Sequence, residues 1–507
     1  MNQRIRRSLP LAIALALGAR VVGAQTFQNF VTVGDSLIAG EESGCVVQRF
    51  QERSWVAITA KQLDMADFEQ PWISEVAATN PLTGYPCLGL TLNGTSLAID
   101  IVSETGQNTN LTLPRPYNNL GFNGSPLMAD FVDLTVTTPG ASDLDNLAGR
   151  VLRNCMGCPF QGMSAVDEAN LLSPDLVAFW GGNNDALNAM FAGVAIVGVT
   201  LTPVDSFTNS TNQVIAGLSA SGRTLVTGDV PDVVTVPYAT TIPPVVVDPT
   251  TMQPVIVGGQ LVPLLGPGDD AYPCTPAPPD SGCALPQGSL VMLPASTLLG
   301  QGVGIPTAVG GTGKPLPHGT FTPPSTLTPG VVLYPDDITL IESTIASYNQ
   351  AIAAAATANG ATLIDSNALF AVVAKNGYDV GGIHLSTAYA TGGIFGYDGV
   401  HPAPSGYGIV ADAFIQLLNT VKGTHIPRPN FSDILFTPNV PDIVSSVSTA
   451  DSGPWHYSLD TWKGFLQAGL ARRFAIAMPS TPEAPRATPH LPPAPRAVRH
   501  VERHDID

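Results

Sequence analysis

Apolar residues fall in short, nearly continuous runs at three places along the chain, and each run leads into glycine and polar residues. The runs are Phe-Val-Thr-Val at 30–33, Leu-Val-Ala-Phe-Trp at 176–180 and Thr-Leu-Val-Thr-Gly at 224–228. Short runs rich in β-branched and aromatic residues predict strands that are buried on both faces. A fourth strand of this kind is expected at 361–365.

Between these runs the apolar residues are arranged as in amphipathic or buried helices. Ile338, Ile341, Ile345, Tyr348 and Ile352 recur at helical spacing. Asn359 and Gly360 then supply a C-terminal stop. Further helices are expected from about 186, over about 205–220 and from about 405 to 419. Strands that alternate with helices predict an α/β fold with a parallel sheet covered on both faces.

Two regions lack these patterns. Residues 41–117 show no strong period and are expected to be irregular. Residues 232–330 are rich in Pro, Gly, Val and Thr, which predicts an insertion of β-hairpins and ordered loops outside the main sheet. We therefore expect one domain over 25–430 that contains this insertion, then an extension over 431–477. A tail over 478–507, rich in Pro, Ala and Arg, is expected to be disordered.

The N-terminus has the pattern of a secretory signal peptide. Three arginines lie within the first seven residues, residues 9–19 are apolar, and the small residues Val-Gly-Ala follow at 22–24. The apolar segment is short for a membrane helix, so cleavage after Ala24 is preferred to a retained anchor. No later stretch is apolar and long enough to predict a transmembrane helix. The sequence therefore predicts export to the periplasm or the exterior of a bacterial cell.

Composition limits the possible partners. The formal net charge is −18, and a nucleic-acid partner is not expected because phosphate binding needs clustered lysines and arginines. Apolar residues make up 44% and charged residues 12%, which is enough apolar material for a large core.

The chain has six cysteines, at positions 45, 87, 155, 158, 274 and 283. An even number in an exported protein predicts disulfides. Cys274 and Cys283 flank a proline-rich loop and are expected to pair with each other. The Cys-x-x-Cys at 155–158 has a spacing found in metal and redox sites, but no second ligand pair follows it, so no metal is expected.

Two short stretches combine a weak nucleophile with a base. Gly34-Asp35-Ser36-Leu37 follows the first predicted strand and would expose Ser36 at the carboxyl edge of the sheet. Asp398-Gly399-Val400-His401 precedes the last predicted helix. His401 could remove the proton of Ser36, and Asp398 could orient the imidazole. Taken alone, Ser36 also suits a helix N-cap, and an Asp-x-x-His is more often an exposed loop.

Two further stretches carry hydrogen-bond donors. Gly182-Asn183-Asn184-Asp185 follows the strand that ends at Trp180, and an asparagine amide there could donate to an oxyanion. Asn119 to Ser125 contains glycines whose backbone N–H could do the same. The alternatives are an Asn/Gly turn that caps a helix, and ordinary loop glycines.

Together these stretches resemble the blocks of the SGNH/GDSL hydrolase superfamily, in the family's order. Gly34 to Leu37 is similar to the nucleophile block, the stretch around Gly124 to the second block and Gly182 to Asp185 to the third. The run Gly-Gly-Ile-Phe-Gly-Tyr-Asp-Gly-Val-His-Pro at 392–402 resembles the last block of bacterial lipolytic members. The resemblance covers about 28–420. It implies a flavodoxin-like three-layer α/β/α fold and an esterase or lipase that needs no metal or cofactor.

By position, the resemblance implies that Ser36 is the nucleophile, His401 the base and Asp398 its orienting carboxylate. It also implies an oxyanion hole made by the N–H of Ser36, the N–H of Gly124 and the side chain of Asn184, with Gly121 as an alternative to Gly124. A general base must be neutral, so the rate is expected to rise with pH through an apparent pKa of about 6–7.

Other functions remain open at this point. A carbohydrate O-deacetylase or an acyltransferase would use the same triad, because water or another hydroxyl can resolve the same acyl-enzyme. A non-catalytic surface-binding protein on the same fold is a further alternative. An α/β-hydrolase is disfavoured, because the chain has no Gly-x-Ser-x-Gly. The substrate, a small-molecule, lipid or glycan ester, would be selected by walls from 41–117 and 232–330.

Overall fold

The computed structural model describes most of the chain. The described residues are 26–93, 96–135, 143–153, 159–268, 271–274, 282–436, 462, 466, 470 and 473–478. The predicted signal peptide, the Cys-x-x-Cys at 155–158 and most of the predicted extension and tail lie outside these residues.

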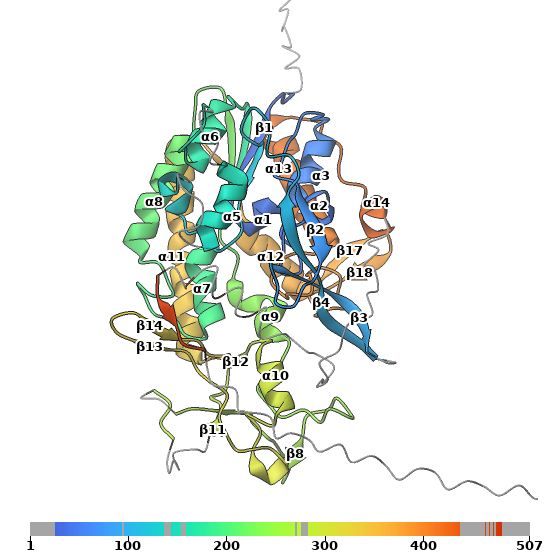
Figure 1. The fold of residues 1–507 in the computed structure, drawn as a ribbon, viewed down its shortest axis with the longest axis vertical. Helices are drawn as coiled ribbons and strands as arrows, with labels where there is room; N and C mark the ends of the chain where they lie inside the picture. The colour runs from blue at the N-terminus through green and yellow to red at the C-terminus, as the bar shows by residue number, and fades with distance from the viewer. Residues whose placement is uncertain are drawn as a thin grey trace, which may run out of the picture.

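A five-stranded parallel sheet forms the centre of the molecule (Figure 1). Its strands are β1 (Phe30–Gly34), β5 (Asn119–Gly121), β6 (Leu176–Trp180), β7 (Thr224–Gly228) and β16 (Thr362–Ile364), in the order β16-β7-β6-β1-β5. This is the flavodoxin-like order, in which the chain builds the sheet from β1 toward one edge and then from β6 toward the other edge. Ligands of such sheets bind where these two halves meet, beyond the carboxyl ends of the strands.

Side chains alternate between the two faces of the sheet. Val31 and Phe179 point into the larger core, whereas Phe30, Ala178 and Trp180 point to the opposite face. The larger core is covered by α5 (Asp143–Leu152), α6 (Ala165–Leu171), α7 (Asn184–Ala192), α8 (Val204–Leu218) and α11 (Pro335–Asn359). The opposite face is covered by α3 (Trp55–Gln62) and α13 (Pro404–Lys422). The three-layer α/β/α architecture is therefore confirmed (Figure 1).

The predicted strands and helices of this framework are confirmed to within a few residues. Elements of the framework that the sequence did not identify are the strand β5 and the helices α3, α5 and α6. The long helix α11 ends at Gly360, which has a left-handed φ of 67° as the C-terminal stop predicts. Further helices are α4 (Asp130–Asp133), α12 (Ser366–Asn376) and α14 (Phe431–Phe436), and β17 (Tyr378–Val380) pairs with β18 (Ile383–Leu385).

The expectation of an irregular 41–117 region was wrong. After α1 (Ser36–Ala39), α2 (Gln48–Gln51) and α3, the strands β2 (Ile73–Ala77), β3 (Pro86–Asn93) and β4 (Ser96–Asn108) form an antiparallel sheet in the order β2-β4-β3. Leu90 pairs with Ile99, so alternate apolar residues share one face. This period-two pattern is interspersed with Gly, Thr and Asn, which hid it in the composition.

The 232–330 region contains short elements that pair mainly among themselves. They are η1 (Val233–Thr235), α9 (Pro237–Thr240), β8 (Ile256–Val257), β9 (Gln260–Leu261), β10 (Leu265–Gly266), β11 (Cys283–Ala284), β12 (Leu290–Val291), α10 (Ala295–Gly300), η2 (Thr307–Val309), β13 (Thr320–Thr322) and β14 (Thr326–Thr328). Beyond it, β15 (Val332–Leu333) pairs with β12 and β19 (Ala475–Ile476) with β14. Among the described strands, none of these joins the central sheet.

Within the described part of the chain, no helix combines the length and the apolar character needed to cross a bilayer.

Candidate active site

Ser36 lies on the sharp turn that leaves β1. Gly34 comes so close to β6 that a Cβ there would lie 2.0 Å from the carbonyl oxygen of Trp180, so only glycine fits. Asp35, not Ser36, is the N-cap of α1: its side chain accepts from the N–H of Leu37 at 3.1 Å. Ser36 is thus the first residue of α1, where a backbone N–H has no acceptor within the helix.

Ser36, His401 and Asp398 form a continuous hydrogen-bonded chain. His401 Nε2 lies 2.9 Å from Ser36 Oγ, and His401 Nδ1 lies 2.7 Å from Asp398 Oδ2. Both His401 and Asp398 are buried, whereas Ser36 is partly exposed. This geometry lets the imidazole accept a proton from the hydroxyl while the carboxylate fixes its orientation.

The carboxylate of Asp398 is itself held by three backbone donors. Its Oδ1 accepts from the N–H groups of Val400 and His401, each at 2.9 Å. Its Oδ2 also accepts from the N–H of Gly44 at 2.7 Å. A carboxylate fixed at both oxygens presents one orientation to the histidine.

The two glycines that could donate to an oxyanion, Gly124 and Gly121, lie in different surroundings. Gly124 lines the same pocket as Ser36, and its φ of 91° is a conformation that favours glycine. Gly121 instead lies in β5 against α1, where a Cβ would be 2.4 Å from the backbone nitrogen of Ala39. The structure therefore places Gly124, and not Gly121, among the residues that line the pocket with Ser36.

The two asparagines after β6 have different surroundings. Asn184 lines the pocket, and its Nδ2 donates to the carbonyl of Pro126 at 3.1 Å. An amide nitrogen has two hydrogens, so one is left for a ligand. Asn183 Nδ2 donates to Asp35 Oδ2 at 2.7 Å, which ties the end of β6 to the end of β1.

Burial and nearby charges shift the pKa values of the site in opposite directions. Burial alone would lower the pKa of His401, but Glu41, Asp398 and Asp35 together raise it to about 9. Burial raises the pKa of Asp398, yet the interaction with His401 and its hydrogen bonds outweigh this and leave the pKa below the ordinary value. The pKa of Asp35 is raised to about 6, chiefly by burial. The imidazolium form of the base is thus favoured in the free site.

The remaining walls of the pocket match only in part the two segments, 41–117 and 232–330, from which the sequence analysis expected them. Residues 41–117 contribute Glu41, Gly44, Tyr85 and Pro86, and the apolar side is made by Leu147, Leu187 and Phe191. Among the described lining residues, none lies in 232–330, so the expected wall from that region is not found at this pocket. That region instead contacts the loop that bears Asp398 and His401: the N–H of Tyr238 donates to the carbonyl of Gly399 at 2.8 Å.

Two residues at the site were missed by sequence reasoning. Glu41 and Gly44 follow Ser36 closely in the chain, in the segment Glu-Glu-Ser-Gly-Cys at 41–45. The signal was a pair of glutamates directly after a predicted active-site turn, in a chain with few charges. Nothing in the sequence indicated that Gly44 would reach Asp398, 354 positions away.

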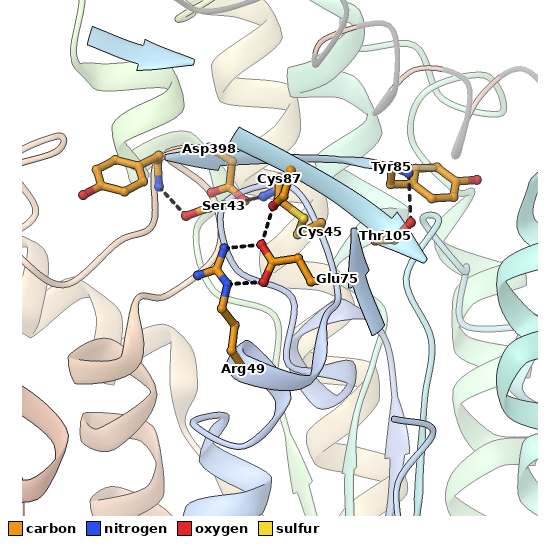
Figure 2. Close-up of a disulfide and its surroundings, with 11 residues drawn as sticks. Ser43, Cys45, Arg49, Glu75, Tyr85, Cys87, Thr105 and Asp398 are labelled. Atoms are coloured by element: carbon orange, nitrogen blue, oxygen red, sulfur yellow. Dashed lines mark hydrogen bonds and ion pairs between the residues drawn. A yellow bond between two sulfur atoms is a disulfide. The ribbon is translucent and has the colours of Figure 1, made fainter. Parts of the chain in front are cut away.

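A disulfide fixes the segment that carries these residues. Cys45 is bonded to Cys87 at the start of β3, with Cα atoms 5.1 Å apart. Figure 2 shows this disulfide close to Asp398 and Ser43, with the Arg49–Glu75 ion pair nearby. The Oγ of Ser43 also accepts from the N–H of Tyr397 at 3.0 Å, in the loop that bears Asp398. The predicted Cys274–Cys283 pair is likewise present.

Removing the two disulfides should have different effects on activity. The Cys45→Ser/Cys87→Ser variant should lose about 4 kcal/mol of stability for the 42-residue separation, and Cys274→Ser/Cys283→Ser about 2.6 kcal/mol for the separation of 9. Only the first should also lower kcat, because it frees the segment whose Gly44 N–H holds Asp398. Thermal melts and ester hydrolysis measured below both transitions would check this. Equal kcat losses in the two variants would contradict it.

Within the described residues, no group of three or more His, Cys, Asp or Glu is arranged to hold a metal ion.

A family model described as GDSL-like Lipase/Acylhydrolase matches residues 30–414. Searches of curated proteins and of solved structures gave no match. The matched span includes β1 with Ser36 and the loop with Asp398 and His401, and it extends into α13.

Proposed function

The chain belongs to the GDSL-like lipase/acylhydrolase family, and from that premise we propose that it hydrolyses a carboxylic ester through an acyl-enzyme on Ser36. The observation that carries the proposal is the position of His401, with Nε2 2.9 Å from Ser36 Oγ and Nδ1 2.7 Å from Asp398. A hydroxyl needs an adjacent base to act as a nucleophile at neutral pH, and this arrangement supplies one.

In the proposed reaction, Ser36 Oγ attacks the ester carbonyl carbon while its proton moves to His401 Nε2. The resulting oxyanion accepts hydrogen bonds from the N–H groups of Ser36 and Gly124 and from the amide of Asn184. The imidazolium then donates its proton to the alcohol oxygen as the ester C–O bond breaks. Water then attacks the acyl-enzyme while His401 takes its proton, the bond between the acyl carbon and Ser36 Oγ breaks, and His401 returns the proton to Ser36 Oγ as the acid leaves. The apolar side of the pocket, Leu147, Leu187 and Phe191, suits the acyl group.

An active-site serine probe tests this assignment directly. A fluorophosphonate should label the wild type and leave Ser36→Ala unlabelled, and a series of p-nitrophenyl esters should define the acyl chain that fits. Product analysis with added alcohols or glycans separates hydrolysis from acyl transfer, because a transferase yields a new ester. Labelling at a serine other than Ser36 would refute the proposed nucleophile.

The enzyme is further proposed to act outside the cytoplasm. The support is the signal-peptide pattern over 1–24 together with the disulfides Cys45–Cys87 and Cys274–Cys283. Disulfides form and persist in oxidising compartments. Expression with the native N-terminus, followed by N-terminal sequencing of the exported protein, tests this, and an intact Met1 on a cytoplasmic product would contradict it.

The pH dependence of the rate should be shifted to the alkaline side. His401 must be neutral to accept the proton, and its pKa in the free site is raised to about 9. Activity is therefore low below this pKa and rises as the pH passes through it. We expect kcat/KM to increase with a midpoint well above the ordinary histidine pKa of about 6.5, and this replaces the apparent pKa of about 6–7 expected from the sequence. A plateau already reached at pH 7 would show that the carboxylates do not act on His401 in this way.

A further inference from the structure

Glu41 is a second carboxylate at the catalytic histidine. Its Oε2 lies 3.9 Å from His401 Nε2, the nitrogen that also faces Ser36 Oγ. The side chains of Glu41 and His401 are 7% and 5% exposed. Glu41 also lines the pocket that contains Ser36. Asp398 and Glu41 therefore approach the imidazole from its two different nitrogens.

The backbone of Glu41 is fixed on both sides. Its N–H donates to the carbonyl of Ser36 at 3.0 Å, so Glu41 and the nucleophile share one turn. Its carbonyl accepts from the hydroxyl of Tyr407 in α13 at 2.5 Å. These two bonds fix the backbone of Glu41, from which the side chain extends to His401.

The charged and titratable groups around His401 come from three segments. Asp35 and Glu41 flank Ser36 in the chain, Asp398 lies on the loop of His401 itself, and Tyr407 follows in α13. Asn123 adds a side-chain hydrogen bond to Glu41. Glu41 is the largest of the influences that raise the pKa of His401, while burial raises the pKa of Glu41 itself.

We propose that Glu41 is a positioning residue that acts through His401: its carboxylate stabilises the imidazolium formed when Ser36 gives up its proton, and thereby sets the pH range of activity. The inference rests on the proposed function, in which His401 is the base. Breaking the Ser36 O–H bond places the proton on Nε2, directly beside the Glu41 carboxylate. The same attraction keeps His401 protonated in the free enzyme to a higher pH.

The test is the pH dependence of kcat/KM in Glu41→Gln, with Glu42→Gln as the matched control. Both glutamates are buried and adjacent in the chain, but it is Glu41 whose carboxylate lies 3.9 Å from His401 Nε2, whereas Glu42 interacts with Asp398. Glu41→Gln should lower the apparent pKa by about one to three units. Its alkaline plateau should fall by less than about tenfold, because a less basic imidazole is a weaker base.

Below the wild-type midpoint, Glu41→Gln should therefore be more active than the wild type. Simple structural damage would not raise the rate at any pH. Glu41→Asp keeps the charge, so its midpoint should stay closer to that of the wild type. The inference is overturned by a Glu41→Gln profile that moves no further than that of Glu42→Gln.

A titration of His401 by NMR separates this inference from the proposed function. The imidazole signals of His401, identified by their absence in His401→Asn, can be followed with pH without any substrate. A lower His401 pKa in Glu41→Gln supports the electrostatic contact even if no ester is hydrolysed. An unchanged pKa, with thermal melts showing a folded variant, overturns the inference even if the wild type is an active esterase.

Discussion

Ser36→Ala should lower kcat by about three or more orders of magnitude without changing the fold. Ser36 Oγ is the atom that would form the bond to the acyl group, and alanine leaves His401 with no hydroxyl to deprotonate. The side chain is partly exposed and small, so its removal leaves the buried cores of the sheet intact. Hydrolysis of a p-nitrophenyl ester measures the loss of kcat, and circular dichroism with a thermal melt checks that the fold is unchanged.

His401→Ala should cost about as much, and the double variant should cost little more than either single change. Residues that act as one unit are strongly non-additive, because removing one partner makes the other useless. Losses that simply add would mean that Ser36 and His401 act independently. Full ester hydrolysis by a folded Ser36→Ala protein would falsify the assignment of the nucleophile.

Asn184→Ala should lower kcat by about 10²–10³ with little change in KM. The amide of Asn184 has one hydrogen engaged by the carbonyl of Pro126 and one available to the pocket. A bond to the developing oxyanion is stronger in the transition state than to the neutral ester, so its loss appears in kcat. Steady-state kinetics on a soluble ester gives the two constants separately.

Asn183 and Asn188 provide controls for this change. Both are buried, but Asn183 donates to Asp35, and Asn188 lies one turn further along α7 and does not line the pocket among the described residues. Asn183→Ala and Asn188→Ala should therefore affect the melting temperature more than kcat. A loss of kcat in Asn183→Ala that exceeds the loss in Asn184→Ala would show that the other asparagine is the donor.

The framework of the fold could be predicted because it is encoded locally. The strands at 176–180 and 224–228 are continuous apolar runs of the right length, and α11 has both its helical spacing and its glycine stop. By contrast, β5 is three residues long and has no pattern of its own. It becomes a strand because β1 lies beside it, and because Asn119 Nδ2 donates to the carbonyl of Ile38 at 2.8 Å.

Some features of the candidate site could likewise be predicted from local sequence, and others required the structure. Ser36, Asn184 and His401 could be located from the sequence, since each lies in a short motif next to a predicted strand or helix, and strand ends meet at one edge of a parallel sheet. The choice of Gly124 over Gly121 required the structure, because both are glycines in one short stretch and only their positions relative to α1 and the pocket differ.

The contacts that tune the site were decided by the tertiary structure alone. His401 meets Ser36 across 365 positions, and Gly44 reaches Asp398 across 354. The approach of Glu41 to His401 likewise depends on how the turn after β1 packs against the loop before α13. A sequence records which groups are present and their local periodicity. The distances that set a pKa or orient a carboxylate arise only when remote segments pack together, because Coulomb interactions and hydrogen bonds depend on separation in space and not along the chain.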